Sequence, residues 1–270
     1  MDYLTSAQNP RVKAWAALKE RKYREQSGTY LVEGVRSITT YLQHGAEILS
    51  FLYDPGASVS ACEELARQCE QQGVPVFALT SQLMAQIADT VHPQGAMAVV
   101  QMDKSEIRAM FQLTRAAGDC RDVLLLVDGV RDPGNLGTMI RSAAAVGVRG
   151  VIALEGTVDF YNPKVVRATM GALATVAVAE ATAEQVIRYA KEYEVRLIGA
   201  DAHAQTSFFE VDLQDRIGLV IGGEAQGISE KLYSSLAARV ALPMPGATES
   251  LNAGVASSVL LYEALRQRLG

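Results

Sequence analysis

The sequence predicts an α/β fold with two domains, and three observations lead to this prediction. Apolar runs of strand length alternate with helical patterns along most of the 270 residues. Glycine, proline and asparagine stand between these runs, where turns and helix ends are expected. The length suggests roughly one or two domains of common size, and an apolar share of 49% is enough for a substantial core.

The N-terminal hundred residues have the pattern of a self-contained α/β unit. Asn9-Pro10 starts a helix, because proline is tolerated in a first turn. Asp54-Pro55-Gly56 is a strong turn signal, and Gly73 is a helix stop. The predicted strands are 29–33, 48–53, 75–79 and 96–101, and the predicted helices are 10–20, 35–43, 61–71 and 81–88.

A second α/β unit follows a mixed-charge helical pattern, which we interpret as a linker helix. The expected domains are therefore 1–103 and 121–270, with the linker at 104–120. Gly147 stops one predicted helix, Asn162-Pro163 starts another, and Ser250 is expected to cap the last. The predicted strands are 123–128, 151–154, 174–178, 195–200, 217–222 and 240–242, with helices at 138–146, 183–193, 229–235 and after residue 250.

Several classes of protein fit the composition poorly. No stretch approaches the ~20 consecutive apolar residues of a membrane helix, and no apolar signal segment follows the N-terminus. Cys62 and Cys69 are expected to share one helix face, and with Cys120 they lack the C-x-x-C spacing of a metal site. We therefore expect a cytoplasmic protein with reduced thiols, no membrane anchor and no metal.

The net charge of −5 argues weakly against a nucleic-acid partner, but basic residues crowd the first segment. Trp15, Tyr23 and Tyr30 are interleaved with them. Basic groups neutralise phosphates and aromatic rings stack on unpaired bases, so an RNA-binding surface is one interpretation. A solvated helix face with Trp15 in the core is the other. The basic residues are Arg11, Lys13, Lys19, Arg21, Lys22, Arg24 and Arg36.

Two glycine-bearing loops give the main site signal. The strand 217–222 ends on Gly222 and Gly223 and leads to Glu224, and ligands of open α/β sheets bind beyond the carboxyl ends of strands. A second loop with prolines and a glycine precedes the last helix. Such loops bring backbone N–H and C=O groups to a small polar ligand, although a pair of tight turns without a ligand would have the same pattern.

A third segment, Gly134-Asn135-Leu136-Gly137 followed by Arg141, has donors that suit a phosphate or a ribose edge. It lacks the G-x-G-x-x-G pattern, so a dinucleotide-dependent oxidoreductase is a weak alternative. This segment alone fits a purely structural interpretation equally well, in which Asn135 caps a helix and Arg141 forms a surface ion pair.

Taken together, three blocks resemble the signature motifs of the SpoU (TrmH-like) RNA ribose 2′-O-methyltransferases of the SPOUT class. The blocks are GNLGTMIRSAAAVG, LVIGGEAQGIS and LPMPGATESLNAGVASSVLLYEAL, and their order, spacing and C-terminal position match the family. In the third block the residues after Asn252 differ from the family pattern, but the differences exchange small residues for other small residues. The segment 5–41, with LTSAQNPRVK and TYLVEGVRSI, is similar to the ribosomal-protein-like RNA-binding domain that precedes many members.

The resemblance implies a C-terminal domain with a deep trefoil knot, S-adenosyl-L-methionine as cofactor, an RNA substrate and a homodimer. It implies methyl transfer to a ribose 2′-hydroxyl, for which we expect ribosomal RNA, with transfer RNA as the alternative. A non-catalytic RNA-binding protein that keeps the fold is the rival from a different class.

The resemblance also implies roles for single residues. The expected cofactor-binding residues are Gly222, Gly223, Leu242, Leu251 and Asn252. The expected catalytic positions are Asn135, Arg141, Glu224, Ser250 and Asn252, with Asn252 one turn into the last helix. RNA contacts are expected from Arg11, Lys13, Arg21, Lys22 and Arg167.

Two of these roles are qualified by chemistry. A guanidinium stays protonated, so we expect Arg141 to grip the phosphate next to the target ribose and to help the hydroxyl lose its proton. Glu224 has two expected roles, to anchor loop N–H groups or to orient Arg141. A carboxylate favoured by the dipole at a helix start is the bland alternative.

Overall fold

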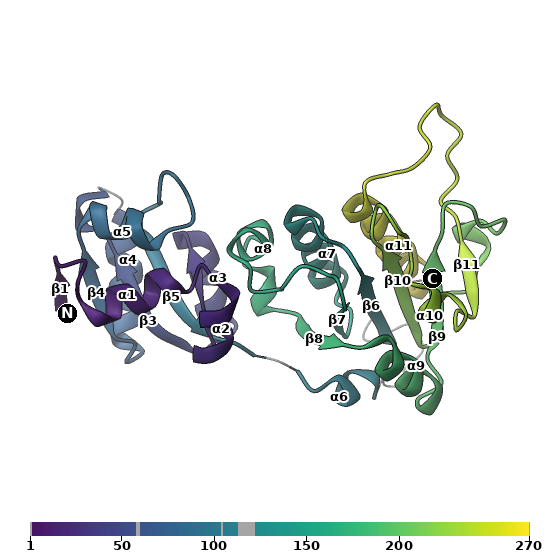
Figure 1. The fold of residues 1–270 in the computed structure, drawn as a ribbon, viewed down its shortest axis with the longest axis horizontal. Helices are drawn as coiled ribbons and strands as arrows, with labels where there is room; N and C mark the ends of the chain where they lie inside the picture. Colours follow the sequence, from purple (N-terminus) through teal and green to yellow (C-terminus); the bar gives the residue numbers. More distant parts are fainter. Residues whose placement is uncertain (1, 58–59, 104, 113–121, 270) are drawn as a thin grey trace. The chain divides into compact units, whose positions relative to one another are not determined.

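The computed structural model describes residues 2–57, 60–103, 105–112 and 122–269, which form two compact units (Figure 1). Unit 1 comprises residues 1–103 and 161–175, and unit 2 comprises residues 104–160 and 176–270. Both units combine helices with a sheet, which confirms the predicted α/β class. The segment 161–175, which we expected in the C-terminal domain, packs within unit 1.

Unit 1 has a mixed five-stranded sheet in the order β1-β4-β3-β5-β2. Strand β5 is antiparallel to both of its neighbours, while β4 is parallel to β1 and β3. The strands are β1 (Asp2–Leu4), β2 (Thr29–Glu33), β3 (Ile48–Tyr53), β4 (Val76–Leu79) and β5 (Ala96–Gln101). The helices are α1 (Pro10–Ala17), α2 (Arg21–Ser27), α3 (Val35–Gln43), α4 (Ser60–Gln71), α5 (Ser81–Ile87) and, from the later segment, α8 (Pro163–Ala168).

The core of unit 1 joins α1 and α5 to the sheet. Trp15 and Val12 of α1 pack with Leu83 of α5 and with Phe77 of β4. The rings of Trp15 and Phe77 lie 5.2 Å apart, between centroids. Trp15 is therefore a core residue, as the structural interpretation of the basic segment required.

Two elements of unit 1 escaped the sequence pattern. Helix α2 is almost entirely polar, so it has no apolar periodicity to reveal it. It is held by Arg24, whose buried guanidinium donates to the carbonyl oxygens of Leu18 and Lys19 at 2.8 and 2.7 Å, just beyond α1. Strand β1 spans three residues, too few for a pattern. Arg24, counted among the basic surface residues, is thus structural.

Unit 2 has a six-stranded parallel sheet in the order β11-β9-β10-β6-β7-β8. Its strands are β6 (Val123–Asp128), β7 (Gly150–Leu154), β8 (Ala177–Ala181), β9 (Arg196–Ala200), β10 (Ile217–Gly222) and β11 (Ala238–Val240). Its helices are α6 (Ile107–Phe111), α7 (Pro133–Val146), α9 (Ala183–Glu192), α10 (Glu230–Tyr233) and α11 (Ala253–Leu269). All six strands were predicted, within three residues of their positions.

Helices cover both faces of this sheet, which explains why its central strands are continuous apolar runs (Figure 1). Helices α6, α9 and α10 pack on the face that carries Leu124 and Leu126 of β6. The alternate residues Leu125 and Val127 point to the other face. Helices α7 and α11 pack against each other and contact β7 and β10.

Several predicted boundaries shift for local reasons. Helix α7 starts five residues before the predicted 138, because the Asp132 side chain accepts a hydrogen bond from the Asn135 N–H and Pro133 occupies the first turn. Gly147 ends α7 in the left-handed conformation, as predicted. The predicted linker helix at 104–120 is described only in part, as α6, and residues 113–121 lie outside the described residues.

Cys62 and Cys69 of α4 are free and buried, and burial raises the pKa of the Cys69 thiol to about 11. The third cysteine, Cys120, lies outside the described residues. Within the described part of the chain, no helix has both the length and the apolar character needed to span a membrane.

Candidate active site

The carboxyl ends of four parallel strands meet at one edge of the unit 2 sheet. Gly222 of β10 is in register with Asp128 of β6, and Ile221 is in register with Ala200 of β9. Val240 of β11 is also paired with Ala200. The turns that follow these strands therefore lie side by side, as the glycine-ended strand 217–222 led us to expect.

Gly222 and Gly223 are required by the fold of the turn after β10. A Cβ added at Gly222 would lie 2.2 Å from the carbonyl carbon of Gly227, and one at Gly223 would lie 2.4 Å from the oxygen of Gly129. The Gly223 N–H donates to the Asp128 carbonyl oxygen at 2.8 Å. We expected these glycines to allow a ligand to approach closely, but the atoms that approach them in the structure belong to the chain's own backbone.

Helix α11 begins differently from the prediction. Its first residue is Ala253, and the Oδ1 of Asn252 accepts a hydrogen bond from the Val255 N–H at 3.2 Å. Asn252 therefore caps the helix, so the predicted cap at Ser250 and the placing of Asn252 one turn into the helix are both wrong. An asparagine is among the best capping residues, so its poor helix propensity is not in itself a site signal.

Polar residues of all three motifs meet in one hydrogen-bonded cluster. The Nδ2 of Asn135, in the first turn of α7, donates to the Oε1 of Glu224, just after β10. The Nδ2 of Asn252 donates to the Oδ1 of Asn135 at 2.8 Å. Because Asn135 is buried and uses both ends of its amide, it fixes the two loops relative to α7.

Glu224 does not play either of the roles that we weighed for it. Its described partner is the Asn135 side chain, and among the described residues neither Arg141 nor a loop N–H donates to it. A carboxylate that accepts from an amide holds that amide in one orientation, with its oxygen toward Asn252. Glu224 thus selects the rotamer of Asn135.

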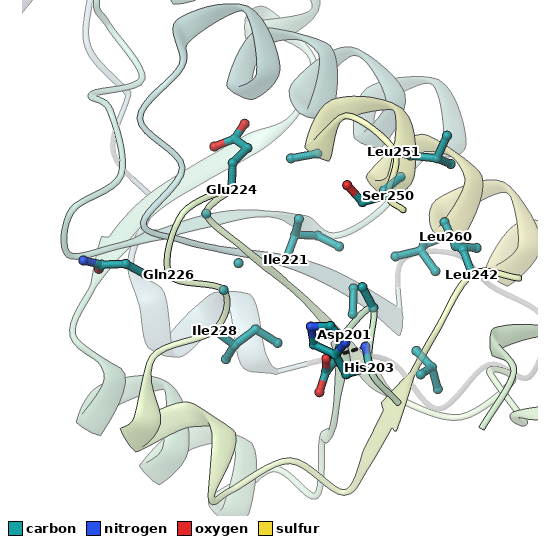
Figure 2. Close-up of a pocket in the computed structure, with 18 of the residues that line it drawn as sticks. Asp201, His203, Ile221, Glu224, Gln226, Ile228, Leu242, Ser250, Leu251 and Leu260 are labelled. Atoms are coloured by element: carbon teal, nitrogen blue, oxygen red, sulfur yellow. Dashed lines mark hydrogen bonds between the residues drawn. The ribbon is translucent and has the colours of Figure 1, made fainter. Parts of the chain in front are cut away.

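A cavity of about 540 Å³ opens between the loops after β9, β10 and β11 and the start of α11 (Figure 2). Gly222, Gly223 and Glu224 of the second motif line it, as do Leu242, Ser250 and Leu251 of the third. Asn135, Arg141 and Asn252 are not among its lining residues. The cavity thus brings together four of the five predicted cofactor residues and two of the five predicted catalytic ones.

The wall of the cavity is apolar with an acidic rim. Ile221, Leu242 and Leu260 supply apolar surface, and the charged lining residues include three carboxylates, Asp201, Glu224 and Glu249. No lysine or arginine is among the described residues that line it. Such a cavity suits an apolar ring and a cationic group, and it is poorly suited to the phosphates of a dinucleotide.

Sequence reasoning missed one side of the cavity, formed by Ala200 at the end of β9, by residues 201–203 after it and by Tyr233 of α10. The signal that could have revealed it is the strand-end rule that pointed to Gly222, since Asp201 directly follows the buried strand β9.

Arg141 lies nearly two turns after Asn135 on α7 and is exposed. It forms no hydrogen bond or ion pair with any residue that the structure describes, so the predicted surface ion pair is absent there. A guanidinium that is free of partners keeps all of its donors for a ligand.

The predicted RNA-binding residues lie on the surface of unit 1, and their contacts within the protein differ. Arg21 pairs with Glu25 at 2.7 Å within α2, and Arg167 pairs with Asp89 at 3.2 Å. Arg11 lies over the Phe77 ring, 4.9 Å from its centroid. Lys13 and Lys22 are exposed. Of the three interleaved aromatic residues, Tyr23 is exposed, while Trp15 and Tyr30 are buried and unavailable to bases.

The parallel sheet and the cavity at its strand ends define an open α/β domain that binds a small ligand beyond the carboxyl edge. Residues 122–262 match the SpoU rRNA Methylase family, and residues 9–98 match the MRM3-like substrate binding domain. The chain therefore belongs to the SpoU rRNA methylase family, which confirms the resemblance seen in the three motifs.

Curated relatives cover nearly the whole chain. It is 32% identical over 245 residues to the 23S rRNA (guanosine-2′-O-)-methyltransferase RlmB of Xanthomonas axonopodis pv. citri, covering 88% of this chain and 97% of the relative. It is also 32% identical over 273 residues to the 23S rRNA (uridine(2479)-2′-O)-methyltransferase of Streptomyces viridochromogenes, covering 98% of this chain and 92% of the relative.

Solved structures show the same fold over the same length. The SpoU methyltransferase AviRb from Streptomyces viridochromogenes in complex with the cofactor AdoMet has a TM-score of 0.87 and 29% identity, covering 97% of this chain and 99% of that one. The AdoMet-bound rRNA methyltransferase from Sinorhizobium meliloti has a TM-score of 0.86 and 27% identity, covering 98% and 97%.

Proposed function

We propose that the protein transfers a methyl group from S-adenosyl-L-methionine to a ribose 2′-hydroxyl of ribosomal RNA. The observation that supports this most strongly is the cavity of apolar and acidic character at the junction of the motif loops. Membership of the SpoU rRNA methylase family and the methyltransferase activity of the relatives support the same reaction. The rRNA methyltransferases that the chain resembles come from bacteria, in which ribosomes are assembled in the cytoplasm, so we place its work there.

The residues of the cavity fit the cofactor. S-adenosylmethionine, when bound, supplies a methyl group that its sulfonium charge activates. Leu242 and Leu251 offer apolar surface to the adenine, and the Gly222-Gly223 turn presents backbone groups without side chains. The acidic rim favours a cation over a phosphate. Asn252 lies outside the cavity wall and supports the cofactor site through Asn135.

Asn135, Glu224 and Asn252 hold the loops in the geometry that methyl transfer requires. The hydroxyl oxygen must be aligned with the methyl carbon, and alignment of this kind is worth effective molarities of about 10⁵–10⁸ M. The amide of Asn135 connects the start of α7 to both cofactor loops, so it sets the distance between them. Ser250, exposed at the rim of the cavity, offers its hydroxyl to the ribose.

Arg141 grips the phosphate next to the target ribose. As the O2′–CH₃ bond forms and the S–CH₃ bond breaks, the hydroxyl proton must leave. A guanidinium cannot take it, because it stays protonated in proteins. The phosphate that Arg141 binds lies next to the hydroxyl and accepts the proton, while the positive charge of Arg141 favours the developing oxyanion.

Unit 1 supplies the RNA-docking surface. The match of residues 9–98 to a substrate binding domain supports this role. Lys13, Lys22, Arg11, Arg21 and Arg167 are all exposed, and the three arginines exchange their weak surface contacts for phosphates. Tyr23 is the exposed ring available for stacking.

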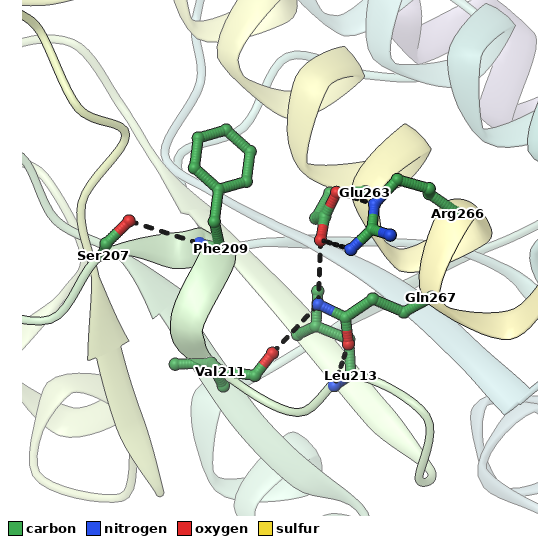
Figure 3. Close-up of polar contacts among 7 residues, drawn as sticks. All are labelled: Ser207, Phe209, Val211, Leu213, Glu263, Arg266 and Gln267. Carbon is green, nitrogen blue, oxygen red and sulfur yellow. Dashed lines mark hydrogen bonds and ion pairs between the residues drawn. The ribbon is translucent and has the colours of Figure 1, made fainter. Parts of the chain in front are cut away.

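The protein acts as a homodimer through the outer face of α11. Val255, Val259 and Tyr262 follow one another at helical spacing and are 47%, 37% and 51% exposed. Phe209, on the loop between β9 and β10, is 53% exposed, and this loop lies beside the end of α11, where the Gln267 amide donates to the Val211 carbonyl oxygen (Figure 3). Three exposed apolar side chains on one helix face are typical of a protein interface. The trefoil knot implied by the family also stays a prediction.

The test is direct labelling of RNA. Purified protein, tritiated S-adenosylmethionine and total RNA from a strain that lacks the gene are incubated, and the labelled RNA is digested to nucleosides. We expect label in one 2′-O-methylated nucleoside of ribosomal RNA, and none when Gly222→Ala replaces the wild-type protein. Label on a base would disprove the reaction class, and label in transfer RNA would disprove the substrate. No label, despite cofactor binding, would favour the non-catalytic rival.

A further inference from the structure

The β9 side of the cavity is outside the three motifs, yet it places a carboxylate beside the ligand space. Asp201, His203 and Tyr233 line the cavity. In Figure 2, Asp201 and His203 lie at a different end of the cavity from Glu224, with Ile221 between them. The cavity thus has two separate acidic ends, and Glu224 is already committed to Asn135.

Asp201 is held in place from three directions. Its Oδ1 accepts from the His203 N–H at 2.9 Å, and its Oδ2 accepts from the Tyr233 hydroxyl at 2.9 Å. Its own N–H donates to the Val240 carbonyl oxygen of β11 at 3.0 Å. The carboxylate therefore has a fixed orientation before any ligand arrives, which lowers the entropic cost of binding one.

A series of hydrogen bonds leads from Arg239 through the Tyr233 hydroxyl to the Asp201 carboxylate. The Arg239 guanidinium donates to the Tyr233 hydroxyl oxygen and lies 3.7 Å from the Oδ2 of Asp201. Arg239 is at the solvent side, with a side chain 51% exposed, whereas that of Asp201 is 14% exposed. Every donor in this series of hydrogen bonds points toward Asp201, so the carboxylate of this cavity-lining residue can only accept.

An acceptor of this kind selects ligand groups that donate. An ionised carboxylate has two oxygens and about four lone-pair sites, so Asp201 can accept a further bond beside those from His203 and Tyr233. Hydroxyl and ammonium groups satisfy it, whereas a phosphate or carboxylate would be repelled. S-adenosylmethionine has two such donors besides its adenine, the ribose hydroxyls and the ammonium of its methionine part.

We propose that Asp201 binds a ribose hydroxyl or the ammonium of S-adenosylmethionine, with Tyr233 and Arg239 as positioning residues. This inference rests on the proposed function, since it names the cofactor contact made by the β9 side of that cavity. It assigns to a residue outside the motifs the task of orienting the cofactor from the end opposite Glu224.

The test is calorimetric titration with two ligands, S-adenosylhomocysteine and 5′-methylthioadenosine, which retains the ribose and lacks the ammonium. Asp201→Asn is expected to weaken binding roughly tenfold or more, because a charge-assisted bond is lost. Tyr233→Phe, which leaves the carboxylate intact but unsupported, is expected to weaken it about two- to tenfold. An equal loss for both ligands identifies the ribose, and a loss for S-adenosylhomocysteine alone identifies the ammonium.

The matched control is Asp212→Asn. Asp212 makes the same local bond, accepting from the N–H two residues ahead at 2.9 Å, but does not line this cavity. It should leave both affinities within twofold of wild type. If Asp201→Asn also leaves both affinities within twofold of wild type, the inference is overturned. If Asp201→Asn does not fold, Tyr233→Phe is measured instead, and unchanged affinities for that variant overturn the inference. If the wild-type protein binds neither ligand, the proposed function itself has failed.

Discussion

The Nδ2 of Asn252 donates a hydrogen bond of 2.8 Å to the Oδ1 of Asn135, although 117 positions separate the two residues in the sequence. This bond ties the cap of the last helix to the first turn of α7. Glu224 accepts from the other end of the same amide. One buried side chain therefore links the three motif segments, and the loops that line the cavity depend on its orientation.

Asn135→Asp should break this link with almost no change in size. The new carboxylate removes the donor to Glu224 and puts two like charges in contact. We expect the single-turnover rate of methyl transfer to fall by about 10–100-fold. The matched control is Asn162→Asp at the cap of α8, where a carboxylate can still accept from the Lys164 N–H. A rate for Asn135→Asp equal to that of the control would contradict the linking role.

Gly222→Ala should destroy the cavity. The new Cβ would lie 2.2 Å from the Gly227 carbonyl carbon and 2.4 Å from the Ile228 nitrogen, so the turn must move. We expect loss of cofactor binding by calorimetry and a free energy of unfolding lower by about 1–3 kcal/mol. Gly246→Ala is the control, because a Cβ there meets nothing within 4 Å. Equal cofactor affinity for the two variants would show that the turn does not form the site.

Arg141→Lys should separate cofactor binding from catalysis. Arg141 is outside the cavity wall, so the affinity for S-adenosylmethionine should not change. A lysine cannot reproduce the two parallel bonds of a guanidinium to a phosphate, so methyl transfer should slow by about tenfold or more. Arg188→Lys, on the exposed side of α9, is the control for charge. Near-full single-turnover activity of Arg141→Lys would refute the bidentate grip.

Tyr262→Asp should produce monomers if the outer face of α11 is the dimer surface. Burying an unpaired carboxylate at an interface costs more free energy than the burial of the apolar side chains supplies. We expect light scattering with size-exclusion chromatography to give the mass of two chains for wild type and of one for the variant. Tyr3→Asp, at an exposed tyrosine of unit 1, should remain dimeric. A monomeric wild-type protein, or a dimeric Tyr262→Asp variant, would count against this surface.

The acid stability of the C-terminal helix should depend on Glu263. The Arg266 guanidinium donates two hydrogen bonds of 2.8 Å to this buried carboxylate, and the Gln267 amide donates another at 2.9 Å (Figure 3). The bonds from Arg266 hold the pKa of Glu263 below its ordinary value of 4.5, against the opposing effect of burial. A lowered pKa in the folded state stabilises it above pH 4.5, and this stabilisation is lost as the pH falls further.

Glu263→Gln should therefore lower the free energy of unfolding at pH 7, and the difference from wild type should shrink as the pH falls below 4.5. Chemical denaturation at a series of pH values measures it. A difference between the two proteins that is constant from pH 7 to pH 3.5 would mean that the ionised carboxylate is not the stabilising form.

Much of the fold could be predicted because its strands are buried on both faces. Apolar runs such as that of β6 signal a covered parallel strand, and glycines such as Gly147 mark the ends of helices. Helix α2 was missed because its stability comes from one buried guanidinium, that of Arg24, and not from an apolar stripe. A single long-range contact leaves no periodic trace in the sequence.

The candidate site was predictable to a similar extent. The strand-end rule located Gly222 and Gly223, and the motifs supplied Asn135, Glu224 and Asn252. What the sequence could not show is the partner of each polar group. Glu224 binds an amide 89 positions away, and the cap of α11 is Asn252, not Ser250. Asp201 went unnoticed because its neighbours in sequence resemble no motif of the family.

The structure of the protein in complex with S-adenosylmethionine, determined by crystallography, tests the central claim most directly. We expect the adenine between the Gly222-Gly223 turn and Leu251, with the methyl group open to the side where we propose that Arg141 binds RNA. Cofactor density outside this cavity, or none in crystals grown at millimolar cofactor, would contradict the account.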